Sequence, residues 1–395
     1  MLILKANNKT GFAKAEIGDG LDLSYPESRT RRGRVCKGMS HTLTRGGCDH
    51  TIIKEGKTMR DYRIRKLTPR ECWRLMGFRD SDYDKARRVN SRTQLYKQAG
   101  NSIVVNVLMR IINQLTDRAE KGAFQPCLFE PINYTIDKPI RLVELFAGIG
   151  SQAKALHNLG LDFEAYRVIE WDKFCIRSYN AIFGTAFEPQ DICKTTGADL
   201  GIVDTDKFTY LMTYSFPCQD LSVRGKGKGM SKEGNTRSGL LWEVERLLKE
   251  TEELPQILLM ENVPQVHSKK NTADFERWIA FLKSKGYSNF WRDLNAKNYG
   301  IPQNRNRCFM VSILGDHDYA FPSPIPLELR LKDMLEAEVD DYYFLSDSQL
   351  EGINNQKYHF GGYKYRVAKK DDVSNVLTRH DRFDPRCVDL GGDDG

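Results

Sequence analysis

The sequence predicts an α/β protein in which an open, mostly parallel sheet is covered by helices and joined to a smaller, irregular region. Between residues 141 and 315, short apolar runs alternate with helical patterns, which is typical of such sheets. A glycine-rich turn follows the first of these runs. The flanking segments differ in composition. Residues 1–60 are rich in Gly and Arg, whereas residues 316–395 contain scattered prolines, are rich in Tyr and show only weak hydrophobic periodicity.

Length and composition restrict the class of protein. The chain has 395 residues, which suggests about two or three domains. Hydrophobic residues make up 40% and charged residues 29% of the chain, as in ordinary soluble proteins. The net charge of +7 permits an anionic partner. Nine cysteines include no C-x-x-C pair, so we expect reduced thiols and no metal site.

No segment has the composition of a membrane anchor or a leader. No apolar run approaches the roughly 20 residues that a membrane helix needs, and Met1–Thr10 lacks the apolar stretch of a signal peptide. We therefore expect a cytoplasmic protein.

The N-terminal third contains two predicted helices. Residues 68–78 begin with an N-cap Thr, a Pro at the first helical position and a Glu at the third, and end near a Gly. Residues 103–115 carry apolar side chains at i, i+4 spacing, which predicts an amphipathic helix. Residues 118–140 contain three prolines and are a predicted linker.

The middle of the chain contains the predicted sheet. Two helices are expected between its strands, near Gly239–Lys249 and Phe275–Lys285. The predicted strands are Arg141–Ala147, Arg167–Trp171, Phe208–Tyr214, Gln256–Met260 and Cys308–Ile313.

The turn after the first strand predicts a nucleotide-type cofactor. Gly148 and Gly150 let the backbone turn tightly and approach a ligand. Glu170 ends the next strand, where a carboxylate can accept both hydroxyl protons of a ribose. Trp171 is either a core residue or a face on which an adenine stacks. The same turn fits a dinucleotide fingerprint, so adenosylmethionine and NAD both remain open at this point.

Polar side chains lie at the ends of later strands. Cys218 follows one strand and Glu261 follows the next, where open α/β sheets bind ligands. Arg305 and Arg307 precede the last strand, and alternation would place both on one face. Each of these groups also has a purely structural interpretation. Cys218 would then be a buried, inert thiol, Glu261 a carboxylate at the start of a helix, and the two arginines part of a solvated basic edge. Together, beside a nucleotide turn, they favour a shared site.

A thiolate, a carboxyl group and an arginine near an adenosyl cofactor suit one reaction in particular. Carbon 5 of cytosine is a poor nucleophile until a thiolate adds to carbon 6 and breaks the aromaticity of the ring. A carboxyl group at ring nitrogen 3 and an arginine at the ring carbonyl would stabilise and orient the adduct. Such a base must leave the DNA stack to be reached.

With these residues, the chain resembles a bacterial or phage DNA cytosine-5 methyltransferase. The matching blocks span residues 65–313: Phe146-Ala147-Gly148-Ile149-Gly150, Glu170-Trp171, Asp191-Ile192, Pro217-Cys218-Gln219, Glu261-Asn262-Val263, Gln303-x-Arg305-x-Arg307, Arg65-x-Leu67-Thr68-Pro69-Arg70-Glu71 through Gly77-Phe78, and Gln98-x-Gly100-Asn101-Ser102.

The resemblance implies a Rossmann-like mixed sheet that binds S-adenosylmethionine, with a role for each matching residue. Cys218 would be the nucleophile, Glu261 the group at ring nitrogen 3, and Arg305 and Arg307 the holders of the cytosine and a nearby phosphate. The implied cofactor residues are Phe146, Gly148, Gly150, Glu170, Trp171, Asp191, Ile192, Leu240, Asn101 and Ser102.

The resemblance also implies double-stranded DNA as partner, a monomer, no membrane, and a cognate restriction endonuclease as a candidate companion in a bacterium or a phage-infected host. The stretch Ser222–Asn235 would be a loop that closes on DNA. Its implied contacts are Ser222, Arg224, Lys226 and Lys228, with Arg224 filling the gap left by the flipped base.

The order of the blocks departs from the family pattern, because the two blocks that usually close the chain come first here. We interpret the sequence as circularly permuted. The expected parts are 1–94, part of a small target-recognition domain; 95–117, a helix packing on the catalytic domain; 118–140, the linker; 141–315, the catalytic domain; and 316–395, the remainder of the recognition domain.

Three other functions remain as alternatives. A nicotinamide oxidoreductase would use the glycine turn but not Cys218, Glu261 and Arg307 together. A non-catalytic DNA-binding protein would not need the intact Cys218 and Glu261. Methylation of an exocyclic amino group is disfavoured because no Pro-Pro-aromatic motif stands where Cys218 does.

Overall fold

The structure is a computed structural model that divides the chain into two units. The first unit is Met1–Leu75, Ile301–Arg305 and Leu327–Gly395, and the second is Met76–Gly300 and Asn306–Pro326. Among the described residues, no helix is long and apolar enough to cross a membrane. The described residues are 2–5, 12–16, 18–22, 34–41, 50–54, 63–116, 134–218, 220–221, 229–232, 236–344, 366–368 and 386–388.

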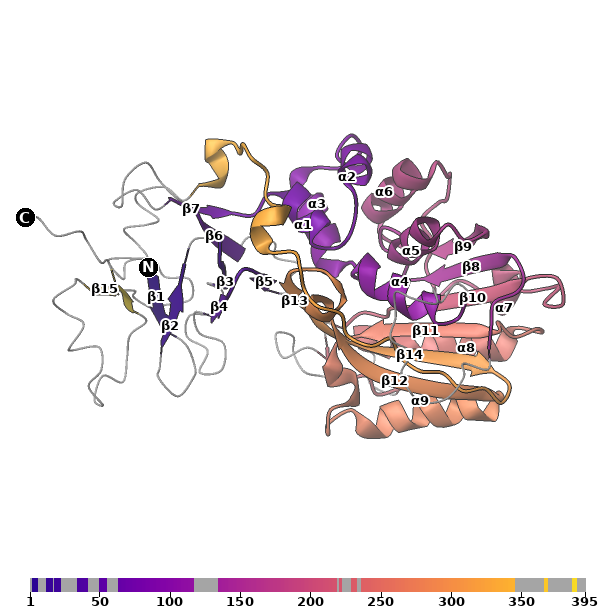
Figure 1. The fold of residues 1–395 in the computed structure, drawn as a ribbon. Coiled ribbons are helices and arrows are strands. Elements are labelled where there is room, and N and C mark those ends of the chain that lie inside the picture. The colour runs from indigo at the N-terminus through magenta and orange to yellow at the C-terminus, as the bar shows by residue number, and fades with distance from the viewer. Residues whose placement is uncertain are drawn as a thin grey trace, which may run out of the picture. The chain divides into compact units, whose positions relative to one another are not determined.

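A six-stranded mixed sheet forms the centre of the second unit, in the order β12-β14-β11-β10-β8-β9 (Figure 1). Strands β9, β8, β10 and β11 run parallel, and β14 runs antiparallel between β11 and β12. The predicted Rossmann-like, mostly parallel sheet is thereby confirmed. The strands are β8 (Ile140–Leu145), β9 (Phe163–Ile169), β10 (Thr209–Tyr214), β11 (Ile257–Asn262), β12 (Tyr287–Asn295) and β14 (Asn306–Leu314).

The burial of the strands explains which of them the sequence predicted. Every residue of β10 and β11 is buried, because helices cover both faces of the central strands and continuous apolar runs are favoured there. The edge strand β12 is largely half-buried, with polar residues throughout. Its pattern carries no strong strand signal, and it was not among the predicted strands.

Helices cover both faces of this sheet. Figure 1 shows α4, α5 and α6 on one face and α8 and α9 on the other. The helix predicted over 103–115 is α4, which packs against α5. The helices of the second unit are α2 (Asp80–Ala86), α3 (Arg92–Asn101), α4 (Val105–Asn113), α5 (Ser151–Leu159), α6 (Lys173–Phe183), α7 (Gly197–Leu200), α8 (Leu241–Glu250) and α9 (Thr272–Ser284), with short 3-10 turns η1 (Arg237–Leu240), η2 (Pro264–His267) and η3 (Ala296–Tyr299).

Apolar side chains of α8 and α9 bury one face of the sheet. Trp278 of α9 lies fully buried and donates its indole N–H to the hydroxyl of Tyr214, which ends β10. Leu247 and Leu248 of α8 are also fully buried in this core. Each fully buried side chain of this size contributes about 1.5–3 kcal/mol relative to exposure. The core thereby gives the strand ends a rigid base.

In its described residues, the first unit contains short strands, one α-helix and two 3-10 turns. Its largest described sheet has the order β4-β3-β6-β7, while β1 pairs with β2, β5 with β13 and β15 with β16. Its elements are β1 (Leu2–Lys5), β2 (Phe12–Ala15), β3 (Gly20–Asp22), β4 (Arg34–Cys36), β5 (Ser40–His41), β6 (His50–Lys54), β7 (Arg63–Lys66), α1 (Pro69–Arg74), β13 (Gln303–Asn304), η4 (Leu331–Met334), η5 (Asp341–Tyr343), β15 (Arg366–Ala368) and β16 (Arg386–Val388).

The predicted capping of the helix in residues 68–78 is confirmed. In α1, Thr68 accepts a hydrogen bond from the backbone N–H of Glu71, and the Glu71 carboxylate accepts one from the backbone N–H of Thr68. Glu71 also forms two hydrogen bonds, of 2.8 and 2.6 Å, with the fully buried guanidinium of Arg65. The cap therefore ties α1 to β7 as well as starting the helix.

The predicted linker and the basic run Arg29–Arg34 fall mostly on residues outside those described. Residues 134–140 of the linker are described, and the backbone N–H of Ile136 donates to the carbonyl of Leu115, just before the linker, at 2.7 Å. This hydrogen bond holds the end of the α4 segment next to the chain that leads into β8.

Candidate active site

The strand ends of the second unit meet at one edge of its sheet. Strands β9, β8, β10 and β11 are parallel and in register, with Tyr214 opposite both Leu145 and Met260. Since β14 is antiparallel to β11, its first residues enter at the edge where β11 ends, and Cys308 lies opposite Asn262. We call this the carboxyl edge. The residues that follow β8, β9, β10 and β11 all leave the sheet there.

The glycine turn after β8 has a backbone conformation that most residues avoid. Phe146, Gly148 and Gly150 have positive φ angles of 60°, 58° and 79°. A Cβ on Gly150 would lie 2.5 Å from Phe183 and 2.6 Å from Tyr179, whereas a Cβ on Gly148 would meet no atom within 4 Å. Gly150 is thus needed for close packing against α6, and Gly148 leaves its outer side open for a ligand.

A buried carboxylate supports the turn from below. Glu144 of β8 accepts a hydrogen bond from the hydroxyl of Tyr179 at 2.6 Å. Burial raises the pKa of Glu144 to about 7, although the hydrogen bonds from Tyr179 and the backbone of Ala153 act in the opposite direction. Sequence reasoning did not select Glu144, because an acid within an apolar strand carries no signal of what packs over it.

Glu170, at the end of β9, is fixed by backbone donors. Its carboxylate accepts hydrogen bonds from the N–H groups of Gly148 at 2.9 Å and Asp172 at 2.8 Å. Burial raises the pKa of Glu170, while these N–H groups act to lower it. A carboxylate oxygen can accept more than one hydrogen bond. Glu170 therefore links the glycine turn to the loop after β9 and still has acceptor capacity.

Trp171 is exposed, which removes the alternative that it is a core residue. Its side chain is 80% accessible beside the buried Glu170. Of the other residues predicted on this side, Ile192 is buried, Leu240 is partly buried and Asp191 is exposed. The Asp191 carboxylate accepts the N–H of Cys193 at 3.0 Å. An open aromatic face beside a fixed carboxylate suits an adenosyl group.

Helix α3 brings its last residues to the start of α5. The Ser102 and Ser151 hydroxyls lie 2.7 Å apart, and Ser151 also accepts the backbone N–H of Ile103. Ser102 is buried, and Asn101 beside it is exposed. The structure thereby brings the predicted Ser102 next to the glycine turn, although 48 residues separate it from Gly150 in the sequence. Sequence reasoning did not select Ser151, because only these contacts show that it connects the end of α3 to the start of α5.

An ion pair joins α3 to the loop after β9. The Lys97 ammonium lies 2.6 Å from the Asp172 carboxylate. Burial alone would raise the pKa of Asp172, but the hydrogen bonds from Lys97 and the N–H of Phe174 outweigh it and hold this pKa below its usual value. Gln98 adds a hydrogen bond to the carbonyl of Phe174. No sequence pattern indicated Lys97, because its partner lies on a distant segment.

The turn that carries Cys218 is held through its backbone carbonyls. The Asn262 side-chain amide donates to the carbonyl of Phe216 at 2.9 Å, and the Ser238 hydroxyl donates to the carbonyl of Pro217 at 2.7 Å. Cys218 is partly buried. Cys218 takes part in no disulfide. Asn262 therefore couples the turn after β10 to the end of β11, where Glu261 lies.

Glu261 and Arg307 form an ion pair across β11 and β14. The Arg307 Nε lies 3.1 Å from the Glu261 carboxylate, and their side chains are 15% and 11% exposed. The predicted strand does not continue through both arginines: Arg305 lies between β13 and β14, in the first unit, and its side chain is 3% exposed. Alternation along one strand therefore does not relate Arg305 to Arg307.

The predicted DNA contacts Ser222, Arg224, Lys226 and Lys228 lie outside the described residues. Of the same loop, residues 229–232 are described, and Lys232 lies 2.8 Å from the Glu245 carboxylate. Beside it is a cavity of about 530 Å³ that Leu240 and Cys193 help to line. Its charged side chains pair with one another, as in Lys249–Glu245 and Arg246–Glu243, so we assign the chemistry to the carboxyl edge rather than to this cavity.

Comparison with known proteins identifies the family. A sequence model described as C-5 cytosine-specific DNA methylase matches residues 5–117 and 140–378. The chain belongs to this family. Membership implies DNA as substrate and a methyl donor as co-substrate, which disfavours the nicotinamide alternative.

Curated relatives are methyltransferases. The chain is 31% identical over 259 residues to type II methyltransferase M2.ScrFI of Lactococcus lactis subsp. cremoris, which covers 53% of this chain and 71% of the relative. It is 36% identical over 233 residues to orphan methyltransferase M.SssI of Spiroplasma monobiae, covering 45% of this chain and 60% of the relative. Among solved structures, an S. pombe Dnmt2 methyltransferase matches with a TM-score of 0.45 at 22% identity, over 59% of this chain and 69% of that one.

Proposed function

We propose that this chain is a sequence-specific DNA cytosine-5 methyltransferase that uses S-adenosylmethionine. One observation supports this most strongly. Glu261 lies in β11 and Arg307 in the neighbouring β14, and Cys218 follows β10 on the other side of β11, all at the carboxyl edge. The glycine turn and Glu170 follow the next two strands, β8 and β9. Open α/β sheets bind ligands at this edge.

The residues at β8 and β9 fit S-adenosylmethionine, which supplies a sulfonium methyl group when bound. The side of Gly148 where a Cβ would point is open. Glu170 is held by two backbone donors and would accept the ribose hydroxyls. Trp171, which is 80% exposed, would stack on the adenine. Asp191, Ile192 and Leu240 would complete the adenine side, with Asn101 and Ser102 near the methionine end.

The residues at β10, β11 and β14 would activate the base. The Cys218 thiolate forms a bond to carbon 6 of cytosine, and the electron pair displaced from the ring double bond makes carbon 5 nucleophilic. Glu261, held by Arg307, hydrogen-bonds at ring nitrogen 3 and stabilises the charge that develops. Carbon 5 would then take the methyl group from the sulfonium, whose carbon–sulfur bond breaks to leave the neutral thioether S-adenosylhomocysteine. Loss of the carbon-5 proton and expulsion of the thiolate then restore the aromatic ring.

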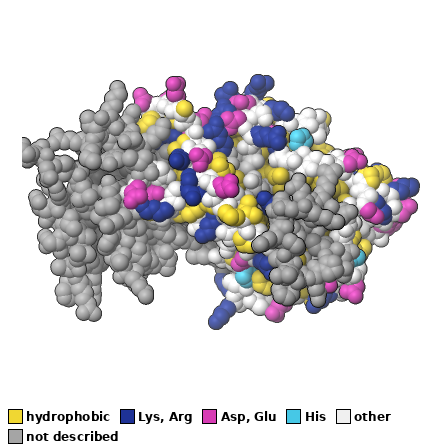
Figure 2. Space-filling model, viewed as in Figure 1, with side chains coloured by type: hydrophobic (Ala, Val, Ile, Leu, Met, Phe, Trp, Pro, Cys, Tyr) yellow, Lys and Arg dark blue, Asp and Glu magenta, His cyan; other side chains and the backbone are white. Residues whose placement is uncertain are grey.

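DNA binding would involve both units. We propose that residues 1–94 and 316–395 form the target-recognition domain, and that 95–117 and 141–315 form the catalytic part. Arg305 would contact the base or a nearby phosphate, and the loop from Ser222 would close over a flipped cytosine. Figure 2 shows that the basic and acidic side chains of the described residues are interspersed on one face.

We also infer that the family blocks are circularly permuted in this chain. The hydrogen bond between Leu115 and Ile136 supports this, since it holds the two ends of the joining segment together. Permutation is tolerated where such ends are close. We expect a monomer that acts in the cytoplasm of a bacterium or phage-infected host, with a restriction endonuclease as a candidate companion.

Nucleoside mass spectrometry tests this proposal. DNA of varied sequence is incubated with the protein and S-adenosylmethionine, and Cys218→Ala is run beside it. We expect 5-methylcytosine with the unmodified protein alone, while Cys218→Ala still binds DNA. Methylation by Cys218→Ala would contradict the mechanism. DNA binding without any methylated base from the unmodified protein would favour a non-catalytic binder.

A further inference from the structure

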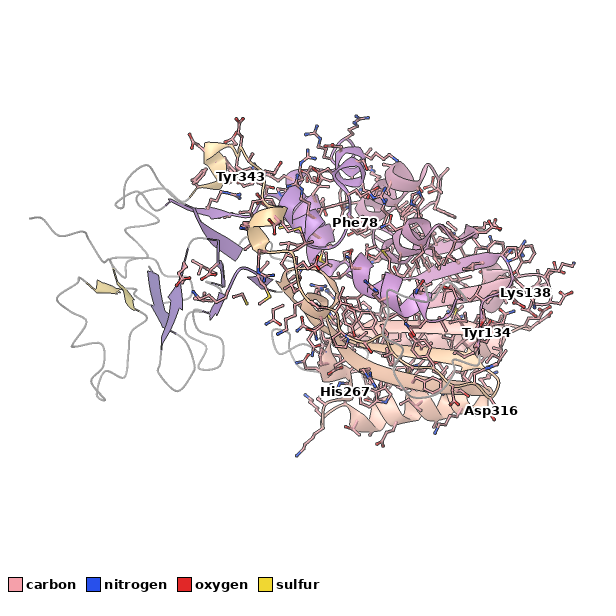
Figure 3. The ribbon with its side chains drawn as sticks, viewed as in Figure 1. Phe78, Tyr134, Lys138, His267, Asp316 and Tyr343 are labelled. Carbon is pink, nitrogen blue, oxygen red and sulfur yellow. The ribbon has the colours of Figure 1, made fainter. Side chains whose placement is uncertain are left out.

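Three side chains of metal-binding type converge where β12, β14 and η2 meet. His267 ends η2, Asp293 lies in β12 and Cys308 lies in β14, and their ligand atoms are all within 4.8 Å of one another. Asp293 and Cys308 are direct partners in the strand register. The His267 Nε2 lies 3.0 and 3.2 Å from the two Asp293 carboxylate oxygens. Figure 3 labels His267 near the start of α9.

We propose that His267, Asp293 and Cys308 bind one zinc-class divalent ion. An imidazole nitrogen, a carboxylate oxygen and a thiolate sulfur are the donors that Zn²⁺ prefers, whereas Mg²⁺ and Ca²⁺ select oxygen ligands. Three protein ligands leave the fourth tetrahedral position for water. This inference does not rest on the proposed methyltransferase activity.

The burial of the three groups suits an ion that enters from solvent. The His267 and Asp293 side chains are 26% and 31% exposed, whereas Cys308 is fully buried beneath them. Water therefore reaches the nitrogen and oxygen donors, and the sulfur closes the inner side. Small shifts would bring atoms now up to 4.8 Å apart to a common ion.

Aromatic neighbours hold the His267 ring in place. The Trp291 ring centroid lies 4.7 Å from that of His267 at an interplanar angle of 35°, and the Phe275 centroid lies 6.2 Å away. A ligand ring that is already oriented loses less freedom on binding. Metal sites depend on such surrounding contacts. The cluster thus combines a suitable donor set with a preset geometry.

The test is a cobalt titration of the chelator-treated full-length protein. Co²⁺ is a spectroscopic substitute for Zn²⁺, and a thiolate ligand produces a near-ultraviolet charge-transfer band. We expect one equivalent to bind with that band, and Zn²⁺ to abolish it by displacement. Cys308→Ser should lose the band, and His267→Gln and Asp293→Asn should weaken binding by at least about tenfold.

A matched control is Cys193→Ser, which removes an exposed cysteine beside Asp191. The band and the affinity should be unchanged in this variant. Thermal melting gives a second readout, because an ion that binds only the folded protein stabilises it. Zn²⁺ should raise the melting temperature of the unmodified protein but not that of His267→Gln. A band that persists in Cys308→Ser, or no thiolate band at all, would mean that the cluster is only a His–Asp hydrogen bond over a buried thiol.

Discussion

Two halves of the carboxyl edge hold their polar groups in different ways. In the cofactor half, at β8 and β9, the groups offered are backbone N–H donors and a carboxylate fixed by them, as Glu170 is by Gly148 and Asp172. In the thiol half, at β10, β11 and β14, side chains would carry the proposed chemistry. There Glu261 is held by the guanidinium of Arg307.

This difference predicts which property a substitution in each half should change: stability, cofactor affinity or reaction rate. A geometry made by the backbone depends on φ angles and close packing, so changes in the cofactor half should alter stability and cofactor affinity. A geometry made by side chains can lose one group while the backbone stays in place. Changes in the thiol half should therefore lower the rate and leave stability and cofactor binding nearly unchanged.

The largest effect is expected for Glu261→Gln. The amide cannot supply the proton or the charge that the carboxyl group offers at ring nitrogen 3, so kcat should fall by roughly 10²–10⁴-fold. Steady-state methylation assays and calorimetry of cofactor binding measure the two quantities. Glu252→Gln, at an exposed position in the turn before β11, is the control and should retain kcat. A loss of cofactor affinity in Glu261→Gln as large as its loss of kcat would contradict the proposed difference between the two halves.

A pair of glycine substitutions sharpens the cofactor half. Gly150→Ala places a Cβ 2.5 Å from Phe183 at a φ of 79°, and should lower the free energy of unfolding by about 2–5 kcal/mol. Gly148→Ala meets no atom within 4 Å, so only the strain of its positive φ applies, about 1–2 kcal/mol. It should instead raise the Kd for the cofactor. Urea denaturation measures the free energy of unfolding, and titration measures the Kd for the cofactor. Equal destabilisation by the two substitutions would contradict the separate roles of Gly150 and Gly148.

Lys97→Met should have a moderate effect, confined to cofactor binding. The Lys97–Asp172 ion pair is partly exposed, so its loss should cost about 1 kcal/mol or less. We expect the KM for S-adenosylmethionine to rise up to about fivefold with kcat unchanged. Lys97→Arg should restore it, and the exposed Lys283→Met on α9 is the control. A fall in kcat without a change in KM would oppose a positioning role.

The last prediction concerns Glu144, whose effect on stability should depend on pH. Its pKa is raised from 4.5 in the unfolded reference to about 7 in the folded protein. Its contribution to stability is therefore fully present below pH 4.5 and is lost as the pH rises through about 7. Relative to the unmodified protein, Glu144→Gln should be more stable at pH 8 than at pH 5. Thermal melting across this range checks it, and a pH-independent difference would exclude this titration.

Local patterns predicted much of this fold, and for identifiable reasons. The capping box of Thr68 and Glu71 and the apolar face of α4 depend on residues within one or two turns of each other. The fully buried strands β10 and β11 are continuous apolar runs. Edge strand β12 was missed because half-exposed residues need no apolar pattern, and the break at Arg305 was missed because alternation assumes an unbroken strand.

The α/β class, the glycine turn and the residue types at the strand ends could be predicted from the sequence, because each depends on residues close together in the chain. Which distant groups meet depends on the packing of the folded chain: Lys97 meets Asp172, Ser102 meets Ser151, and Asn262 meets the carbonyl of Phe216. The cluster of His267, Asp293 and Cys308 has the same origin. Such contacts arise when the core packs helices and strands together, and no spacing along the chain specifies them.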